Sequence, residues 1–157
     1  MRLLVISDSH KMGSVVDRIL SSESEAHEVF FLGDLVSDIE DLTYAYPEKN
    51  FHIVSGNCDF FSRYPTSDIV KLKDMNIFMC HGHNLGVKGS TSALAVAARK
   101  AGCKVALYGH THSPYIQYDD GLYIVNPGSV AQSRNGPCSY AVIDVRSNGI
   151  LPSIVKI

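Results

Sequence analysis

The chain has 157 residues, which is enough for one domain with a substantial buried core, so we expect residues 1–157 to form a single domain. Hydrophobic residues make up 45% of the sequence and charged residues 19%, a composition typical of globular proteins and unlike that of disordered chains. The net charge of -2 argues against an extended nucleic-acid-binding surface and against a surface for anionic membranes.

Other sequence features bear on the compartment of the protein. No apolar run approaches the roughly 18–20 residues of a membrane-spanning helix, so no membrane partner is expected. The apolar stretch from Leu3 to Ile6 is too short for a signal peptide. The four cysteines form no CxxC pair, which favours free thiols in a reducing compartment. We therefore predict a cytoplasmic protein.

Apolar strands alternate with amphipathic helices in the first third of the chain. The first two predicted strands are continuous apolar runs, as expected for strands that are buried on both faces. The strands are predicted over residues 3–6, 29–32 and 51–55, and the helices over residues 14–21 and 38–46. The acidic residues Asp38, Glu40 and Asp41 at the start of the second helix are expected only to favour its dipole.

Hairpins are predicted in the rest of the chain. Residues 68–80 indicate a hairpin that turns at Asp74-Met75-Asn76, and an alanine-rich helix over 91–101 follows, capped by Ser90 and stopped by Gly102. The order of elements predicts an α/β fold in which two mixed β-sheets pack together with helices outside. The remaining strands are predicted over residues 104–108, 116–118, 123–125, 139–145 and 150–157.

Side chains that can bind metals follow most of the predicted strands. His110 and His112 follow the strand over 104–108, and residues i and i+2 of an extended chain project to the same side, so both can reach one site. Asp8 and His10 have the same spacing after the first strand. Imidazole and carboxylate are common metal ligands. The complete set at strand ends is Asp8, His10, Asp34, Asn57, His81, His110 and His112.

The size of this set points to two metal ions. A single pair such as His110 and His112 would more often be part of an ordinary polar loop, so the prediction depends on the whole set. These oxygen and nitrogen donors are too many for one tetrahedral zinc ion. They suit two cations about 3.5–4 Å apart that share a bridging carboxylate, as in many phosphatases and nucleases.

Five motifs in order resemble those of the calcineurin-like binuclear metallophosphoesterases, in their small single-domain bacterial and archaeal branch. The resemblance extends from Asp8 through the loop Asn126–Ser129, and it implies a four-layer α-β-β-α sandwich. The family pattern D-x-H, G-D, G-N-x-[DEH], H-G-H and G-H-x-H is matched by Asp8/His10, Gly33-Asp34, Gly56-Asn57-Cys58-Asp59, His81-Gly82-His83 and Gly109-His110-Thr111-His112.

The resemblance also implies a ligand set and a reaction. The reaction is hydrolysis of a small phosphoester by in-line attack of a metal-bridging hydroxide, with Asp34 and Asn57 in the catalytic set. Manganese is the metal expected first, with iron, zinc and nickel as alternatives. One ion would be held by Asp8, His10, Asp34 and His112, and the other by Asp34, Asn57, His81 and His110, with Asp34 bridging.

One position departs from the family pattern. Many family members carry a histidine directly after the motif asparagine, where it assists the leaving oxygen, whereas this chain has Cys58. A thiol, with an ordinary pKa near about 8.5, is a poor substitute. Either Asp59 or His83 supplies the missing catalytic group, or the substrate has a leaving group that needs little help, which favours a phosphodiester over a monoester.

Alternatives stay open at this point. A protein-interaction scaffold uses the same fold with an eroded catalytic site, and Cys58 would then be a first step of such erosion. The sequence does not determine the substrate or the oligomeric state, a homo-oligomer included. The aromatic residues Tyr44, Tyr46, Phe60, Phe61 and Tyr64 either line a substrate wall or, for most of them, pack in the core or in loops.

Overall fold

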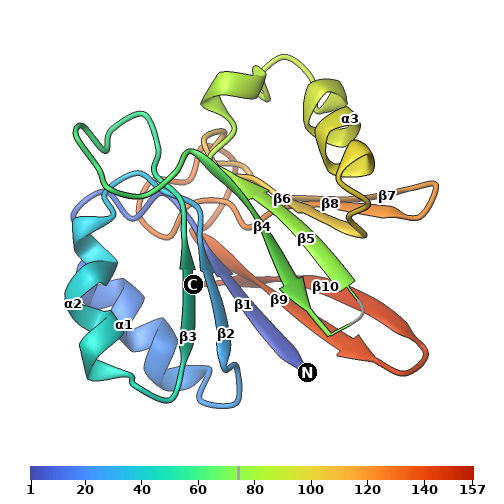
Figure 1. The fold of residues 1–157 in the computed structure, drawn as a ribbon. Helices are drawn as coiled ribbons and strands as arrows, with labels where there is room; N and C mark the ends of the chain where they lie inside the picture. Colours follow the sequence, from blue (N-terminus) through green and yellow to red (C-terminus); the bar gives the residue numbers. More distant parts are fainter. Residues whose placement is uncertain (74) are drawn as a thin grey trace.

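A computed structural model describes residues 1–73 and 75–157 and contains two five-stranded β-sheets that pack face to face (Figure 1). The elements in chain order are β1 (Arg2–Ile6), α1 (Gly13–Ser22), β2 (Glu28–Phe31), α2 (Ser37–Ala45), β3 (Asn50–Ile53), β4 (Ser67–Leu72), β5 (Met75–Cys80), the short 3-10 helix η1 (His83–Leu85), α3 (Ser92–Lys100), β6 (Val105–Leu107), β7 (Tyr115–Asp119), β8 (Leu122–Asn126), β9 (Ser139–Arg146) and β10 (Gly149–Lys156). The strand order is β10-β9-β1-β2-β3 in the first sheet and β4-β5-β6-β8-β7 in the second.

The central core lies between the two sheets. Strand β1 pairs with β2 in parallel and with β9 in antiparallel orientation, and residues 3–6 are fully buried, as their continuous apolar run predicts. Alternate side chains of each strand point into this core, because successive residues of a strand face opposite sides. Its members include Leu3, Val5 and Phe30 from the first sheet and Ile77, Met79 and Leu107 from the second.

Helices cover the outer face of each sheet. Helices α1 and α2 lie on the first sheet, and α3 lies on the second (Figure 1). The apolar residues at helical spacing in α1, Val15, Val16, Ile19 and Leu20, are the ones that are buried. The four-layer α-β-β-α arrangement implied by the family resemblance is therefore confirmed. Within the part of the chain that the structure describes, none of the helices has the length and apolar character needed to cross a bilayer.

The parallel strands of both sheets direct their carboxyl ends toward the candidate site. Strands β1, β2 and β3 are parallel neighbours, and so are β5, β6 and β8. The loops that follow five of these strands, β1, β2, β3, β5 and β6, carry all the predicted ligand residues. Open α/β sheets place their ligand sites outside the carboxyl ends of the strands, and this fold does so from two sheets at once.

Two local predictions differ from the structure. The turn was predicted at Asp74-Met75-Asn76; Asp74 lies outside the described residues, and Met75 and Asn76 already belong to β5. Met75 is buried in the core between the sheets, and this burial favours a strand at this position. The polar side chains of the sequence Asp74-Met75-Asn76 had suggested a turn instead. Helix α3 starts at Ser92 with Thr91 at the N-cap, and Ser90 contributes by accepting the backbone N–H of Ser92 through its hydroxyl oxygen.

Lys49 is a buried cation that the sequence pattern did not reveal. It lies between α2 and β3 and is only 5% exposed, and burial lowers the pKa of its ammonium group. The ammonium donates hydrogen bonds to the carbonyl oxygens of Glu23 (2.9 Å), Ser24 (3.4 Å) and Ala26 (2.9 Å). These carbonyls belong to the connection between α1 and β2. Lys49 therefore links that connection to the start of β3, the edge strand of the first sheet.

Replacing Lys49 with methionine keeps the length and apolar stem of the side chain and removes its donors. The carbonyl oxygens of Ser24 and Ala26 then lose their ammonium donor, while that of Glu23 still accepts the backbone N–H of Ala26 at 3.0 Å. We therefore expect Lys49→Met to lower the free energy of unfolding by about 2–3 kcal/mol. Urea denaturation measures this loss. The matched control is Lys71→Met on the exposed side of β4, which should change stability by less than about 0.5 kcal/mol. Equal effects of the two substitutions would contradict the role given to Lys49.

Candidate metal centre

The structure brings all seven predicted ligand residues together at one end of the sandwich. Three of the supporting strands, β1, β2 and β3, belong to the first sheet, and the other two, β5 and β6, belong to the second. The cluster therefore lies where the carboxyl ends of both sheets meet. Asp8 and His10 follow β1, Asp34 follows β2, Asn57 follows β3, His81 follows β5, and His110 and His112 follow β6.

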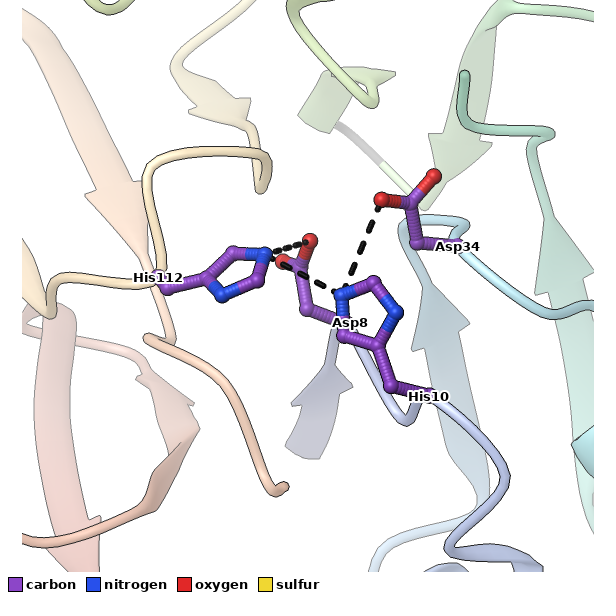
Figure 2. Close-up of side chains that lie close together, drawn as sticks. All are labelled: Asp8, His10, Asp34 and His112. Atoms are coloured by element: carbon purple, nitrogen blue, oxygen red, sulfur yellow. Dashed lines mark hydrogen bonds and ion pairs between the residues drawn. The ribbon is translucent and has the colours of Figure 1, made fainter. Parts of the chain in front are cut away.

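One half of the cluster, the first ligand group, consists of Asp8, His10, Asp34 and His112 (Figure 2). One ligand atom from each of these residues lies within 4.8 Å of the others. His112 Nε2 is 3.1 Å from Asp8 Oδ1 and 3.1 Å from His10 Nε2. His10 Nε2 is 3.8 Å from Asp34 Oδ2. This is the set that the family resemblance assigns to one metal ion.

The other half, the second ligand group, surrounds His81. The Nε2 atom of His81 lies 3.1 Å from Asn57 Oδ1, 3.2 Å from His110 Nδ1 and 3.4 Å from Asp34 Oδ1. Asp34 thus turns one carboxylate oxygen toward each group: Oδ1 toward His81 and Oδ2 toward His10. Its carboxylate is the element that the two groups share.

Hydrogen bonds to backbone carbonyls determine which histidine nitrogens face the site. The Nδ1 atom of His81 is 2.7 Å from the carbonyl oxygen of Leu32, and Nδ1 of His112 is 2.8 Å from that of Gln132. A carbonyl oxygen only accepts, so Nδ1 carries the proton of each neutral ring and Nε2 presents a lone pair. Metal-binding histidines are commonly oriented in this way.

A buried oxygen of Asp8 shows that the residues fit a metal ion. Asp8 Oδ2 accepts hydrogen bonds from the Ser7 hydroxyl (2.5 Å) and from the backbone N–H of His110 (3.1 Å). Asp8 Oδ1 is buried and, among the described residues, has no hydrogen-bond partner. It faces the lone pair of His112 Nε2 at 3.1 Å. Two electron-rich atoms at this distance are stabilised by a cation that both of them bind, so this donor set suits a divalent metal.

The charges of the site attract positive charge. Burial by itself would raise the pKa of Asp34, but the contact with His81 and the backbone N–H of Cys58 outweigh it and hold this pKa well below its usual range. Burial likewise opposes protonation of His81, yet the neighbouring carboxylates raise its pKa. The contact with Asp8 raises the pKa of His112, while burial and the nearby His81 lower that of His110 to about 4. The carboxylates thus favour bound cations, whether protons or metal ions.

Most of the ligand side chains are held by backbone in the left-handed region. The φ angles are 57° at Asp8, 41° at His10, 62° at Asp34, 66° at His110 and 56° at His112. This conformation costs about 1–2 kcal/mol for a residue with a Cβ atom. Such strain persists only where surrounding interactions hold it in place, and it is concentrated at functional sites.

The predicted extended backbone at His110 and His112 is therefore wrong. The N–H of Thr111 donates to the carbonyl oxygen of Gly109 at 2.7 Å, which closes a tight turn in place of an extended strand. The two rings consequently go to different ligand groups: His112 to Asp8 and His110 to His81. Both side chains reach the cluster, although the geometric reason given for their convergence does not hold.

Asp59 clamps two of the ligand-bearing loops together. Its carboxylate accepts backbone N–H groups from Asp34 (2.9 Å), Leu35 (2.9 Å), Val36 (2.7 Å) and Gly56 (2.7 Å). Asp34 and Leu35 are both left-handed, so these bonds hold the strained turn that directs Asp34 into the site. Both carboxylate oxygens are engaged by these backbone donors, so the geometry gives Asp59 a positioning role in place of the acid role left open by the sequence.

Close approach of the same two loops requires glycine. Gly33 has a φ angle of 91°, and a Cβ atom there would collide with the backbone of Ser55 and Gly56. A Cβ atom on Gly56 would collide with the carboxylate of Asp34. The glycines that precede Asp34 and Asn57 are thus needed to bring the two loops into contact.

Several supporting residues were missed by the sequence analysis. The Asp38 carboxylate accepts the Ser9 hydroxyl (2.7 Å) and the Lys11 N–H (2.8 Å), which fixes the loop on either side of His10. The prediction that Asp38 serves only the helix dipole is therefore wrong. No local pattern carries this information, because the partners are 29 and 27 residues away in the chain.

The loop that begins at Asn126 supports the site from the second sheet. The Asn126 amide donates to the carbonyl oxygen of Gly109 at 2.9 Å, beneath His110. The Ser129 hydroxyl donates to the carbonyl oxygen of Asp8 at 2.7 Å. The family resemblance of this loop was a signal for its importance, but only the structure shows that it fixes two ligand-bearing turns.

Cys58 and His83 lie beside the ligand groups. The backbone N–H of Cys58 donates to Asp34 Oδ1 at 2.9 Å, and burial together with the negative charge of Asp34 raises the pKa of its thiol to about 11. The ring of His83 is 5.4 Å from that of His81, between ring centres, and burial and the charge of His81 lower its pKa. Cys58 is therefore a neutral thiol near pH 7, which agrees with its description as a poor substitute for the family histidine.

Comparisons with known proteins bear on the family and on the fold. Residues 1–148 match the sequence model of the calcineurin-like phosphoesterase superfamily domain. The probable metallophosphoesterase YsnB of Bacillus subtilis is 28% identical over 150 residues, which cover 94% of this chain and 86% of YsnB. A predicted phosphoesterase from Streptococcus pneumoniae superposes with a TM-score of 0.86 at 25% identity, over 99% of this chain and 88% of that one. An archaeal phosphodiesterase shares the fold, with a TM-score of 0.72 at 20% identity over 99% of this chain and 100% of that one.

The clamp role of Asp59 predicts a combined loss of stability and metal affinity. Asp59→Ala leaves the backbone donors of two loops unpaired, so we expect a loss of about 2 kcal/mol in the free energy of unfolding. Because Asp34 is then held less firmly, affinity for Mn²⁺ should fall about 10–100-fold. Urea denaturation and calorimetric titration measure the two effects, and Asp41→Ala on the exposed side of α2 is the control. Unchanged Mn²⁺ affinity in Asp59→Ala would rule out the clamp.

Proposed function

This chain belongs to the calcineurin-like phosphoesterase superfamily, and we propose that it is a metal-dependent phosphoesterase that hydrolyses a small phosphodiester at the candidate metal centre. The observation that carries the proposal is the shared carboxylate of Asp34. Its two oxygens face separate groups of nitrogen and oxygen ligands, 3.4 Å from His81 Nε2 and 3.8 Å from His10 Nε2. That arrangement suits two cations that share one bridging ligand.

We assign the two proposed ions to the two ligand groups. The donors are carboxylate, amide and imidazole groups, which are hard or borderline ligands and suit manganese first, with iron, zinc and nickel as alternatives. When bound, two such cations neutralise the charge of a phosphoester and acidify a water molecule for in-line attack. The first ion would be held by Asp8, His10, Asp34 and His112, and the second by Asp34, Asn57, His81 and His110.

The chain's own residues supply orientation and neutral ligands. The carbonyl oxygens of Leu32 and Gln132 keep His81 and His112 in the tautomer whose lone pair faces the site. The backbone N–H of Cys58 and the clamp at Asp59 fix the direction of the Asp34 carboxylate. Ligands that are already oriented lose little conformational freedom when they bind metal and substrate.

Support for the leaving group is weak in this site. Cys58 occupies the position next to Asn57 and carries a neutral thiol, and Asp59 is occupied by backbone donors. His83 is the remaining polar side chain near His81 that could contact the leaving oxygen. We therefore propose a preference for substrates whose leaving group is a stable anion, which favours phosphodiesters with good leaving groups over monoesters of simple alcohols.

The shared carboxylate is tested by Asp34→Asn. With Mn²⁺ at about 100 times its dissociation constant, the wild-type protein should gain about 2.7 kcal/mol for each ion bound, and its Tm should rise by about 5–10 °C per ion. Calorimetry should give two Mn²⁺ ions per chain, and bis(p-nitrophenyl) phosphate should be hydrolysed only with metal. Asp34→Asn keeps an acceptor for the Cys58 N–H but removes the charge, so both the Tm rise and hydrolysis should be lost.

The controls separate this proposal from the scaffold alternative. Asp41→Asn, an exposed change on α2, should behave as wild type in both assays. A wild-type protein that binds two ions yet hydrolyses no member of a phosphoester library would favour the interaction scaffold. Hydrolysis that survives in Asp34→Asn would contradict the role of the shared carboxylate.

Because Cys58 offers only a neutral thiol beside Asn57, we expect the rate to depend steeply on the pKa of the leaving group. For a series of aryl phosphodiesters, kcat/KM should fall strongly as the pKa of the leaving phenol rises, because a placed acid is worth about 10²–10⁴-fold for poor leaving groups. Cys58→His should flatten this dependence and help the poorest leaving groups most. Cys58→Ala should change the rates little, since a neutral thiol is not the donor. Loss of turnover in Cys58→Ala with metal still bound would assign the thiol a direct role.

A further inference from the structure

An open cavity of about 490 Å³ adjoins the candidate metal centre on the side of Cys58. One wall is formed by the start of α2, and the other by the loop over residues 58–63. Its lining begins at Leu35 and Cys58, and these residues directly follow Asp34 and Asn57 in the chain. The backbone N–H of Cys58 donates to Asp34 Oδ1 at 2.9 Å, so the cavity begins beside the shared carboxylate.

Two phenyl rings at the edge of this cavity are exposed to water. Phe60 is 81% exposed and Phe61 is 106% exposed, while Tyr46 and Tyr64, which the sequence grouped with them, pack against the core beneath α1 and α2. Phe61 also has a φ angle of 59°, a strained conformation for a bulky residue. Neither ring contributes to core packing, and exposed aromatic residues beside a polar site are typical of ligand binding.

The charges along the cavity favour an uncharged ligand group. Arg63 lies at its edge, but its guanidinium is paired with Glu40 of α2 at 3.2 Å. Asp59 is likewise engaged by backbone donors inside the wall. Among the described residues that line it, the cavity therefore offers no unpaired cation for a second phosphate, and it presents two aromatic rings.

We propose that this cavity binds a flat aromatic ring carried by one substituent of the phosphodiester, such as a nucleobase, with Phe60 and Phe61 as the stacking residues. The proposal rests on the proposed function, because the phosphate must be held at the metal centre for its substituent to reach the cavity. It narrows the substrate class to phosphodiesters that carry a nucleoside or another aryl-bearing group. Stacking tolerates different bases, since every base has a π-face.

The test compares two phosphates that differ only by the base. Uridine 5′-monophosphate and ribose 5-phosphate present the same phosphate and sugar, so the ratio of their dissociation constants on the Mn²⁺-loaded protein isolates the ring. Calorimetry should show that the wild type binds the nucleotide at least about 10-fold more tightly. The double variant Phe60→Ala/Phe61→Ala should reduce this ratio to about one and leave the affinity for ribose 5-phosphate unchanged. Its Tm should stay at the wild-type value, because neither ring is packed.

A matched control and separate outcomes make the test decisive. Tyr118→Ala removes an exposed aromatic ring on β7, at the edge of the second sheet, and should leave both dissociation constants unchanged. Equal affinity for the two phosphates in the wild type, or a ratio that survives in the double variant, would overturn the aromatic subsite while metal-dependent hydrolysis stands. Absence of binding by either phosphate together with absence of hydrolysis would instead contradict the proposed function.

Discussion

Repulsion between electron-rich atoms around Asp34 is the constraint on which the rest of this structure depends. Carbonyl oxygens beneath the site fix the tautomers of His81 and His112, so lone pairs converge on two buried carboxylates. Such an arrangement is unfavourable for folding unless a cation relieves it. Hydrogen bonds to the backbone hold the strained turns in place and so maintain this arrangement. Four of these bonds are accepted by the carboxylate of Asp59. Stability and site geometry are therefore supplied by the same contacts.

The two-sheet architecture explains why so many ligands can meet in one place. A parallel strand delivers the residue after its carboxyl end to one edge of the sheet, and packing two sheets brings two such edges together. The core between the sheets fixes their relative position, with Leu3 and Val5 of β1 at its centre. Helices cover only the outer faces, which leaves the loop end of the sandwich free for the site (Figure 1).

The sequence predicted those parts of the molecule whose physical causes are local. Continuous apolar runs such as residues 3–6 correspond to buried strands. What the sequence did not predict depends on partners that are distant in the chain. Asp59 accepts N–H groups from residues 23 to 25 positions earlier, and Lys49 reaches carbonyls at a similar separation. The left-handed turn at His110 was missed for the same reason, since its support comes from Asp8 and Asn126.

The loop over residues 56–63 shows how one segment can separate metal binding from substrate choice. Gly56 to Asp59 are bonded to the Asp34 turn through a glycine contact, the Cys58 N–H and the Asp59 carboxylate, so changes there disturb the ligands. Phe60 and Phe61 follow immediately and stand free in solvent. A substitution at these two positions changes the surface offered to a ligand, because among the described residues neither ring packs in a core cluster or supports the metal ligands. Substitutions at Phe60 and Phe61 would therefore change which substituent of the substrate binds, while the strained turns that hold the metal ligands stay the same.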